Sequence, residues 1–405
     1  PASIYDPEGL MEPFAYNDII DPEKVKSLAK DNPNLKKFGD QFSAAKYSRE
    51  VVSGAGAYTL EEWVEGEKIV LKRKENWWGD ALVDKNPMLT ANPDELVFKF
   101  IPDVTSTISL MRNGEVDIAR DIPNTLFKEL EQDQAFTKDV QLLAPDSYLL
   151  TFIALNTQNP KLADRRVRRA LAHLLDVEEI IKTVKKGMAI PIAGPIPPTV
   201  PFSHKGLALI DLNLDKAKTL LAEAGWKDSN NDGTVDKVID GQREELVLSY
   251  LMTPSSEVST DIALIFQNVA KSAGIKIEPE VKEANAFREG LKKRDFDMYT
   301  AGSRIEPDSY DPYQTWHSSS NNPSGSNRVG FGSAESDAII ERIRTTLDKE
   351  ERTQLLLRLQ EMIYEEQPAI YVYNTKEAIA VSKRLKNVQP SFRSPGYFEN
   401  YFQLK

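Results

Sequence analysis

The chain has 405 residues, of which 40% are hydrophobic and 28% are charged, a composition typical of globular domains. With 51 Lys and Arg against 62 Asp and Glu, the formal net charge is −11. This balance argues against a nucleic-acid partner, because binding nucleic acid depends on basic surfaces that displace counterions. The absence of cysteine excludes disulfides, thiolate metal sites and cysteine nucleophiles. The length suggests two or three domains.

The first part of the chain predicts short helices followed by β structure. Residues 21–31 predict a helix, and residues 58–63 and 68–73 predict a hairpin around Gly66. Residues 95–101 predict a strand, residues 105–113 a helix that ends at Gly114, and residues 115–118 a strand. No stretch approaches the roughly 20 apolar residues of a membrane-spanning helix. The chain starts at Pro1 without a recognisable leader, so we expect a processed or truncated chain.

From residue 148 onward, strands and helices alternate. Residues 148–156 form an apolar run without alternation, which predicts a strand buried on both faces. The predicted helices are 165–175, 214–224, 258–269, 284–293, 337–347 and 348–366, and the predicted strands are 245–251, 275–281, 296–301 and 369–373. A polar loop covers residues 302–332. This pattern predicts an α/β layered fold.

The loop after the strand at 296–301 is rich in acidic and aromatic residues. It contains Arg304, Glu306, Asp308 and Asp311, together with the rings of Tyr310, Tyr313, Trp316 and His317. Paired carboxylates beside aromatic rings suit a glycosidase, and they equally suit a binding loop with apolar walls. A surface loop without a ligand is the third alternative.

The segment 228–236 has the spacing of a calcium-binding loop. Its candidate oxygen ligands are Asp228, Asn230, Asp232, Thr234 and Asp236. Gly233 provides the turn, but Ile239 stands where a bidentate Glu usually completes the site. The alternative is an Asn/Asp/Gly turn that binds no metal.

Two further features favour structural interpretations. The run of arginines at 165–169 predicts a solvated helix face, with an anion site as the alternative. His173 lies in an apolar helix and predicts a core histidine.

Several motifs occur together in one order along the chain. They are Gly54-Ala-Gly56-Ala-Tyr58 with Trp63, Asn76-Trp77-Trp78-Gly79, Ile101-Pro-Asp103, Leu110-Met-Arg-Asn-Gly114, Phe152-Ile-Ala-Leu-Asn156, Leu162-Ala-Asp-Arg-Arg-Val167, Gly194-Pro-Ile-Pro197 and Leu220-Leu-Ala-Glu-Ala-Gly225-Trp226. This series resembles family 5 of the extracellular solute-binding proteins, the receptor components of peptide, nickel and opine ABC importers.

The resemblance implies a periplasmic-binding-protein-like, two-lobed (type II) α/β fold. Lobe I would comprise residues 1–149 and 375–405, and lobe II residues 150–374. Family members carry a long segment before the first matching motif, so the resemblance implies that the N-terminal part of lobe I is absent.

The implied function is that of an extracytoplasmic substrate-binding subunit, not an enzyme. It would capture an oligopeptide or related small polar solute by lobe closure and deliver it to membrane permease subunits. We expect a monomer, periplasmic or lipid-anchored, without a cofactor. A structural calcium ion is expected only under the calcium-loop interpretation of residues 228–236. A secreted hydrolase using loop 304–317 is the alternative.

The resemblance also indicates where a ligand would bind. Its expected contacts are Tyr148, Arg304, Glu306, Asp308, Tyr310 and Trp316. Peptide-binding members often carry Trp-x-x-Asp after the strand that matches 296–301, and the Asp takes the peptide ammonium. Here Gly302-Ser-Arg-Ile305 occupies that place, so the acidic role would pass to Glu306 or Asp308, while Arg304 suits an anionic ligand.

Overall fold

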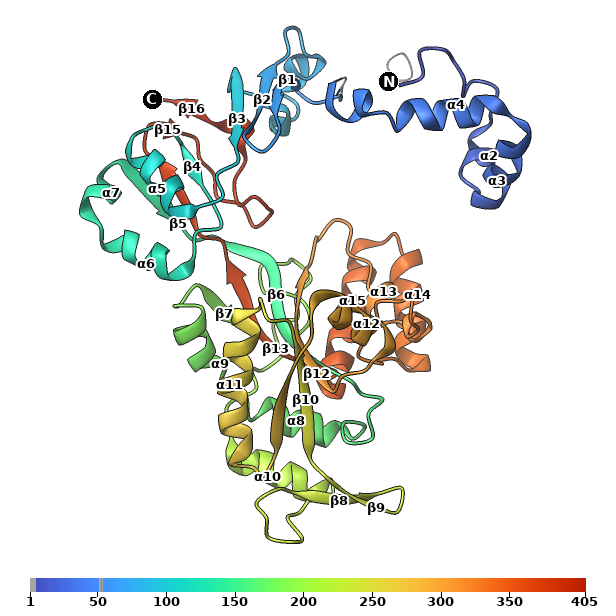
Figure 1. The fold of residues 1–405 in the computed structure, drawn as a ribbon, viewed down its shortest axis with the longest axis vertical. Coiled ribbons are helices and arrows are strands. Elements are labelled where there is room, and N and C mark those ends of the chain that lie inside the picture. Colours follow the sequence, from blue (N-terminus) through green and yellow to red (C-terminus); the bar gives the residue numbers. More distant parts are fainter. Residues whose placement is uncertain (1–4, 51, 53) are drawn as a thin grey trace. The chain divides into compact units, whose positions relative to one another are not determined.

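A computed structural model describes residues 5–50, 52 and 54–405. Contacts within the chain divide it into two compact units (Figure 1). Unit 1 comprises residues 1–119, 382–389 and 398–405, and unit 2 comprises residues 120–381 and 390–397. The predicted lobe boundary after residue 149 falls within strand β6 (Asp146–Leu155) of unit 2, and the lobe assignment stays a prediction.

Unit 1 combines short helices with an antiparallel sheet. Its elements are α2 (Tyr16–Ile19), α3 (Pro22–Asp31), α4 (Pro33–Phe42), β1 (Tyr58–Val64), β2 (Lys68–Arg73), β3 (Glu95–Lys99), α5 (Val104–Arg112), β4 (Ile118–Ala119), β15 (Leu385–Lys386) and β16 (Gln403–Leu404). The predicted hairpin is confirmed, because β1 pairs with β2, and β3 completes the sheet in the order β1-β2-β3. Gly114 follows α5 with φ of 75°, the left-handed conformation that ends many helices.

Unit 2 is built around a six-stranded mixed sheet in the order β11-β10-β12-β6-β13-β7. Its strands are β6, β7 (Ala189–Pro191), β10 (Val247–Met252), β11 (Lys276–Val281), β12 (Met298–Arg304) and β13 (Ala369–Lys376). Strand β10 runs parallel to β11 and β12, whereas β6 is antiparallel to both β12 and β13. The predicted strand at 148–156 is therefore confirmed, with partners on both edges.

Helices cover both faces of this sheet (Figure 1). They are α8 (Arg165–Ala172), α9 (Val177–Glu179), α10 (Leu214–Glu223), α11 (Glu257–Lys271), α12 (Ala284–Lys293), α13 (Tyr313–Trp316), α14 (Ala334–Thr345) and α15 (Lys349–Glu366). The remaining elements of the unit include α6 (Asn124–Gln132), α7 (Gln134–Asp139), β5 (Val140–Leu143), β8 (Asp236–Ile239) and β9 (Gln242–Glu245).

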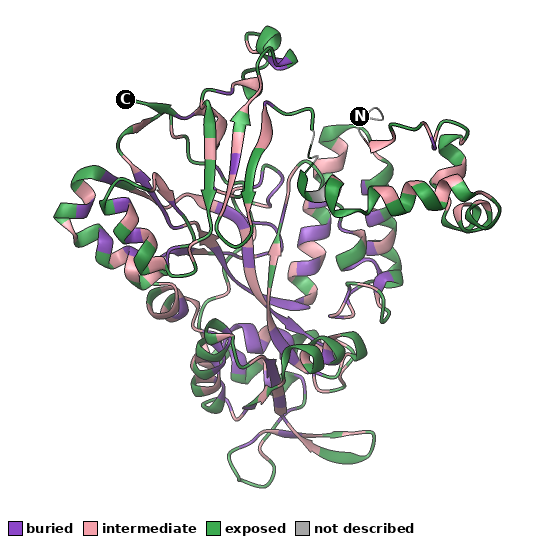
Figure 2. Cartoon of the chain, turned by 45° about the horizontal axis from the view of Figure 1, so that its top comes forward, coloured by how far each residue is buried: buried purple, intermediate pink, exposed green. Residues whose placement is uncertain are grey.

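Alternation along the central strands creates two separate cores. Ile153 and Leu155 of β6 pack with α8, α10 and α11, whereas Leu150 and Ala154 pack with α14 and α15. Successive side chains of a strand point to opposite faces, so one strand supplies both cores. Figure 2 shows that buried residues gather along these strands, with half-buried ones between them. Burial of both faces explains why the sequence of β6 lacks polar alternation.

The structure corrects the predicted loop at 302–332. Strand β12 continues to Arg304, because Gly302, Ser303 and Arg304 pair with Thr151, Leu150 and Leu149 of β6. Within the loop, α13 forms a short helix. The strand predicted at 115–118 is reduced to β4. Among the described residues, no helix combines the length and apolar character needed to cross a membrane.

Candidate functional site

A cavity of about 280 Å³ opens in unit 2 beside the ends of β6 and β12. Its lining comes from β6, β12, the loop after β12, α13, β13 and the loop after β7. It consists of Leu150, Phe152, Pro195, Ser303, Arg304, Ile305, Glu306, Ser309, Tyr310, Asp311, Thr315, Trp316 and Tyr371. Such a volume is slightly below the range of pockets for drug-sized ligands, so it suits one side chain or a small solute.

The pairing of β12 with β6 positions the charged rim of this cavity. Arg304 lies opposite Leu149 in the last register pair. The N–H of Ile305 then donates to the carbonyl of Tyr148 at 2.9 Å, one residue beyond the strand. These bonds fix the backbone up to residue 305. They therefore also define where the backbone of the next residue, Glu306, lies.

Aromatic rings form the apolar walls. Trp316 is 5% exposed and meets Phe331 edge to face at 5.6 Å between centroids, and Tyr310 stacks on Phe202 at 5.6 Å. Tyr371 lies 6.1 Å from Phe152. Burial raises the pKa of the Tyr310 and Tyr371 phenols well above the ordinary value of 10, so both stay neutral. Packed rings of this kind give the cavity rigid walls.

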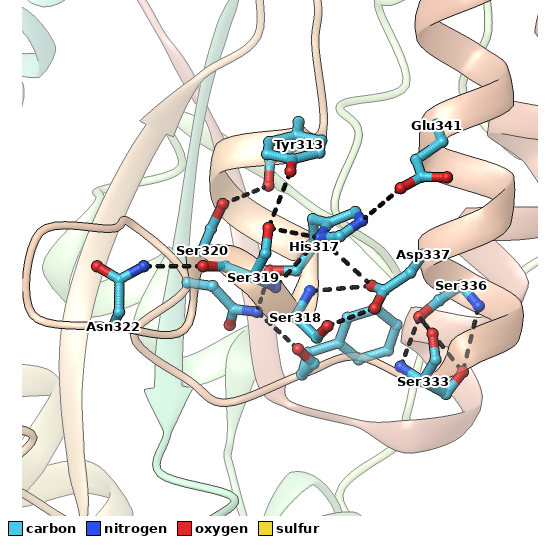
Figure 3. Close-up of polar contacts among 12 residues, drawn as sticks. Tyr313, His317, Ser318, Ser319, Ser320, Asn322, Ser333, Ser336, Asp337 and Glu341 are labelled. Atoms are coloured by element: carbon cyan, nitrogen blue, oxygen red, sulfur yellow. Dashed lines mark hydrogen bonds and ion pairs between the residues drawn. The ribbon is translucent and has the colours of Figure 1, made fainter.

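A network of polar contacts holds the segment after Trp316 against α14 (Figure 3). Ser318 N–H donates to Asp337 at 2.9 Å, and Ser319 N–H donates to His317 Nδ1 at 3.1 Å. The hydroxyls of Tyr313 and Ser319 lie 2.9 Å apart. These contacts fix both ends of α13, and they thereby fix the ring of Trp316 in the cavity wall.

The charged groups on the lining differ in their partners. The Arg304 guanidinium lies 3.7 Å from the carboxylate of Glu377. Asp311 accepts from Tyr313 N–H at 3.0 Å and pairs with Arg344 at 3.0 Å. Among the described residues, no hydrogen bond or ion pair engages the half-buried carboxylate of Glu306.

Four of the six predicted contact residues come together at the cavity: Arg304, Glu306, Tyr310 and Trp316. The other two lie elsewhere in unit 2. Tyr148 packs against Phe392 at 5.8 Å between ring centroids, and Asp308 is hydrogen-bonded to Arg393. The ligand-binding role of all six residues stays a prediction.

Sequence reasoning missed a large part of the lining. Leu150 and Phe152 follow from alternation along β6 once its central position is known. Asp311 was named among the carboxylates of the acidic loop but not among the expected ligand contacts. Tyr371 comes from β13, and only the pairing of β13 with β6 brings it to the cavity, so no local signal indicates it.

The predicted calcium loop forms a turn whose carboxylates accept backbone hydrogen bonds. Asp228 accepts from the N–H groups of Asp232 and Gly233 at 3.2 and 3.0 Å. Asp232 accepts from Thr234 N–H at 2.8 Å and from the Asn230 amide at 2.8 Å. Within the described part of the chain, no group of three or more His, Asp or Glu side chains is placed to hold a metal ion. The calcium site stays a prediction.

Asp236, the last candidate ligand, has its own partners. Its carboxylate accepts from Ser229 N–H at 2.9 Å and from the Ser229 hydroxyl at 2.7 Å, and it pairs with Arg243 at 3.2 Å. The hydrogen bond from Ser229 N–H is the largest of the influences that hold the pKa of Asp236 below its ordinary value. A carboxylate that accepts hydrogen bonds from N–H, hydroxyl and guanidinium groups stays ionised without needing a metal ion.

The predicted solvated face of the arginine cluster is wrong for Arg168. This residue is 3% exposed and donates to the carbonyls of Leu162 and Ala163 at 2.8 Å, and its Nε donates to Glu366 O at 2.9 Å. The guanidinium thus binds the carbonyls at the end of α15. His173 is a core residue as predicted, 1% exposed, with Nδ1 2.8 Å from the carbonyl of Asp211.

Solved structures confirm the predicted α/β fold. The oligopeptide-binding protein AppA from Bacillus subtilis, solved with a nonapeptide, matches with a TM-score of 0.67 and 24% identity over 94% of this chain and 71% of that chain. NikA from Brucella suis, solved with Fe(III)-EDTA, matches with a TM-score of 0.72 and 21% identity over 87% of this chain and 68% of that chain. The fold is therefore that of the periplasmic-binding-protein class.

The sequence places the chain within that class. The model for the bacterial extracellular solute-binding proteins, family 5 (middle part), matches residues 10–325, and the chain belongs to this family. AppA from Bacillus subtilis is 27% identical over 352 residues, which is 84% of this chain. The chain spans 60% of the length of that relative.

Proposed function

We propose that this chain belongs to the substrate-binding subunit of an ABC importer and that the cavity in unit 2 holds part of an oligopeptide or a related small polar solute. The protein binds and releases this ligand without making or breaking a bond, through closure of two lobes. The proposal is supported by the family, whose members are solute-binding proteins, and by relatives named as oligopeptide- and dipeptide-binding proteins.

One observation carries the proposal: the cavity combines rigid aromatic walls with charged groups of both signs. Apolar walls that contain a few convergent polar groups are typical of sites for small ligands. A hydrolase would need an acid and a base held opposite a reacting bond. Here Asp308 and Asp311 are each paired with an arginine, so binding is the function that the geometry supports best.

The remaining parts of the proposal concern the whole protein. We expect a monomer on the outer side of the cytoplasmic membrane, in the periplasm or attached by a lipid, which presents its ligand to permease subunits. The domain division into lobe I (1–149 and 375–405) and lobe II (150–374) is part of this proposal.

Isothermal titration of the 405-residue chain with a library of di- to nonapeptides tests the proposal. We expect saturable binding of a subset and a rise of the unfolding midpoint with peptide concentration. Chromatography of the same mixtures should show no cleavage product. Peptide turnover that Asp311→Asn abolishes, or the absence of binding by every peptide, contradicts the proposal.

A further inference from the structure

We propose that Arg294 and Arg328 form a binding site for a phosphate-type oxyanion, separate from the ligand cavity of unit 2. Arg294 follows α12, and Arg328 lies in the segment that leads to α14. Strand β12 begins just after Arg294, and the cavity lies around the other end of this strand. At roughly 3.3 Å per residue, the length of β12 separates the two places by about 20 Å.

A hydrogen bond holds the two arginines in one neighbourhood. Arg294 Nη2 donates to the carbonyl of Asn327 at 2.9 Å, and Arg328 is the next residue. Asn327 is fully buried, and its amide donates to the carbonyl of His317 at 3.1 Å. The carbonyl of Arg294 accepts from the amide of Asn156 at 3.3 Å. Buried polar groups therefore fix both backbones, and the two guanidinium groups extend from a rigid frame.

The charges of the two arginines lack compensation within the described residues. In that part of the chain, no ion pair engages either guanidinium, and no hydrogen bond engages the side chain of Arg328. The buried Nε of Arg294 finds no hydrogen-bond partner among the same residues. The carboxylates that flank Arg294 in the sequence are bound elsewhere. Asp295 pairs with Lys282 at 3.1 Å, and Asp297 accepts from a backbone N–H of β10 at 2.7 Å.

The two positive charges act on each other. Burial lowers the pKa of the Arg294 guanidinium, and the charge of Arg328 lowers it further. Burial raises the pKa of the Tyr299 phenol to about 12, and the charge of Arg328 partly offsets this rise. The Arg328 guanidinium therefore lies near both groups. Like charges that are partly removed from water repel each other, and an anion that binds both arginines removes this repulsion.

The chemistry of this pair suits a phosphate group. A planar guanidinium can donate two parallel hydrogen bonds to phosphate oxygens, and the free Nε of Arg294 is one such donor. A phosphate monoester carries roughly two negative charges at pH 7, which matches two guanidinium groups better than the single charge of a carboxylate. Two sources share this chemistry, free inorganic phosphate and the headgroup of phosphatidic acid.

The first arm of the experiment uses inorganic phosphate. The unfolding midpoints of the wild-type chain, Arg328→Gln and Arg166→Gln are measured with and without millimolar phosphate at constant ionic strength. Without phosphate, Arg328→Gln should be at least as stable as the wild-type chain, because the substitution removes the repulsion. With phosphate, the wild-type midpoint should rise above that of Arg328→Gln. Isothermal titration should show that Arg328→Gln binds phosphate at least about ten-fold more weakly.

Arg166→Gln is the matched control, since it removes the same charge from unit 2. Arg166 is already paired with Asp164 at 2.7 Å, so phosphate should stabilise this variant as much as it stabilises the wild-type chain.

The second arm uses vesicles of phosphatidylcholine with and without phosphatidic acid. If the headgroup reaches the site, the wild-type chain and Arg166→Gln should sediment with the vesicles that contain phosphatidic acid, and Arg328→Gln should not. If only the free anion binds, none of the three should sediment. Binding in either arm that Arg328→Gln loses and Arg166→Gln retains supports the site and names the source of its phosphate.

The assignment is overturned by the absence of binding in both arms, by binding that Arg328→Gln retains, or by binding that Arg166→Gln loses equally. A marked loss of stability of Arg328→Gln without phosphate overturns it too, because Arg328 would then have a partner in the protein. The site lies away from the cavity, so Arg328→Gln should bind peptides as the wild-type chain does. Failure of this proposal therefore leaves the proposed function unchanged.

Discussion

Two acid-rich segments of unit 2 are held in place by different forces. In the turn at 228–236, Asp228, Asp232 and Asp236 accept hydrogen bonds from neighbouring backbone N–H groups. In the loop at 304–317, the half-buried ring of Tyr310 and the buried ring of Trp316 hold the backbone. Among the described residues, no hydrogen bond or ion pair engages the Glu306 carboxylate. Acidic composition alone therefore does not distinguish the two segments, whereas the donors already bound to each carboxylate do.

The largest expected effect comes from removing an aromatic anchor of the cavity loop. Trp316→Ala should lower the free energy of unfolding by roughly 3 kcal/mol, the usual cost of truncating a buried aromatic side chain, and it should abolish peptide binding. Urea unfolding followed by circular dichroism measures the first effect. Trp63→Ala, at a position 43% exposed, is the control and should cost far less. Equal costs would show that Trp316 does not anchor the loop.

The contribution of Asp236 to the stability of the turn at 228–236 should change with pH. Asp236→Asn should lower the unfolding midpoint at pH 7 by roughly 2–4 °C, on the scale expected for losing a charge-assisted contact in a protein of this size. Asp232→Asn keeps an acceptor for Thr234 N–H, and it should change the midpoint by less.

The pH dependence follows from the lowered pKa of Asp236 in the folded chain. Its ordinary value is 3.8, so the ionised carboxylate stabilises the fold above that pH, and this contribution is lost as the pH falls through the lower folded-state value. The midpoint difference between the wild-type chain and Asp236→Asn should be constant from about pH 7 to about pH 5 and shrink below about pH 4. A constant difference down to pH 2 would contradict this interpretation.

A smaller effect should follow from creating a second unpaired carboxylate at the cavity. Arg344→Gln releases Asp311, which lines the cavity, from its ion pair. Because both partners are partly exposed, we expect a gain in affinity for cationic peptides of at most about five-fold at low salt, and the gain should vanish at high salt. Titration of Ala-Lys-Ala at the two salt concentrations measures it. A loss of affinity would mean that Arg344 itself contacts the ligand.

The smallest expected effect concerns calcium. Backbone donors already bind Asp228 and Asp232, so we expect no tight binding of calcium by this turn. Adding millimolar calcium or EDTA should therefore shift the unfolding midpoint by less than about 1 °C. A larger shift that Asp228→Asn removes would establish the calcium site that the spacing predicts.

Local sequence patterns were sufficient to predict many of the helices and strands of the chain. Asp348 begins a helix as predicted, and its side chain accepts from the N–H of Glu351 at 2.8 Å. The apolar run of β6 and the glycine after α5 were also correct. These features depend on residues within a few positions of one another, and such signals are visible in a single sequence.

Features that depend on distant segments were not predictable from local patterns. Arg168 is buried because the end of α15 supplies carbonyls nearly 200 residues away in the sequence. Strand β12 extends to Arg304 because β6 provides partners for its last three residues.

The sequence by itself determined the family, the α/β class and the segment that would line a cavity, because motifs and periodicity are local. Only the tertiary structure decided which acidic side chain remains available to a ligand. Asp308 and Asp311 differ from Glu306 in having arginine partners, and those arginines come from residues 393 and 344. Pairing between charges depends on distance in space, and a single sequence contains no record of that distance.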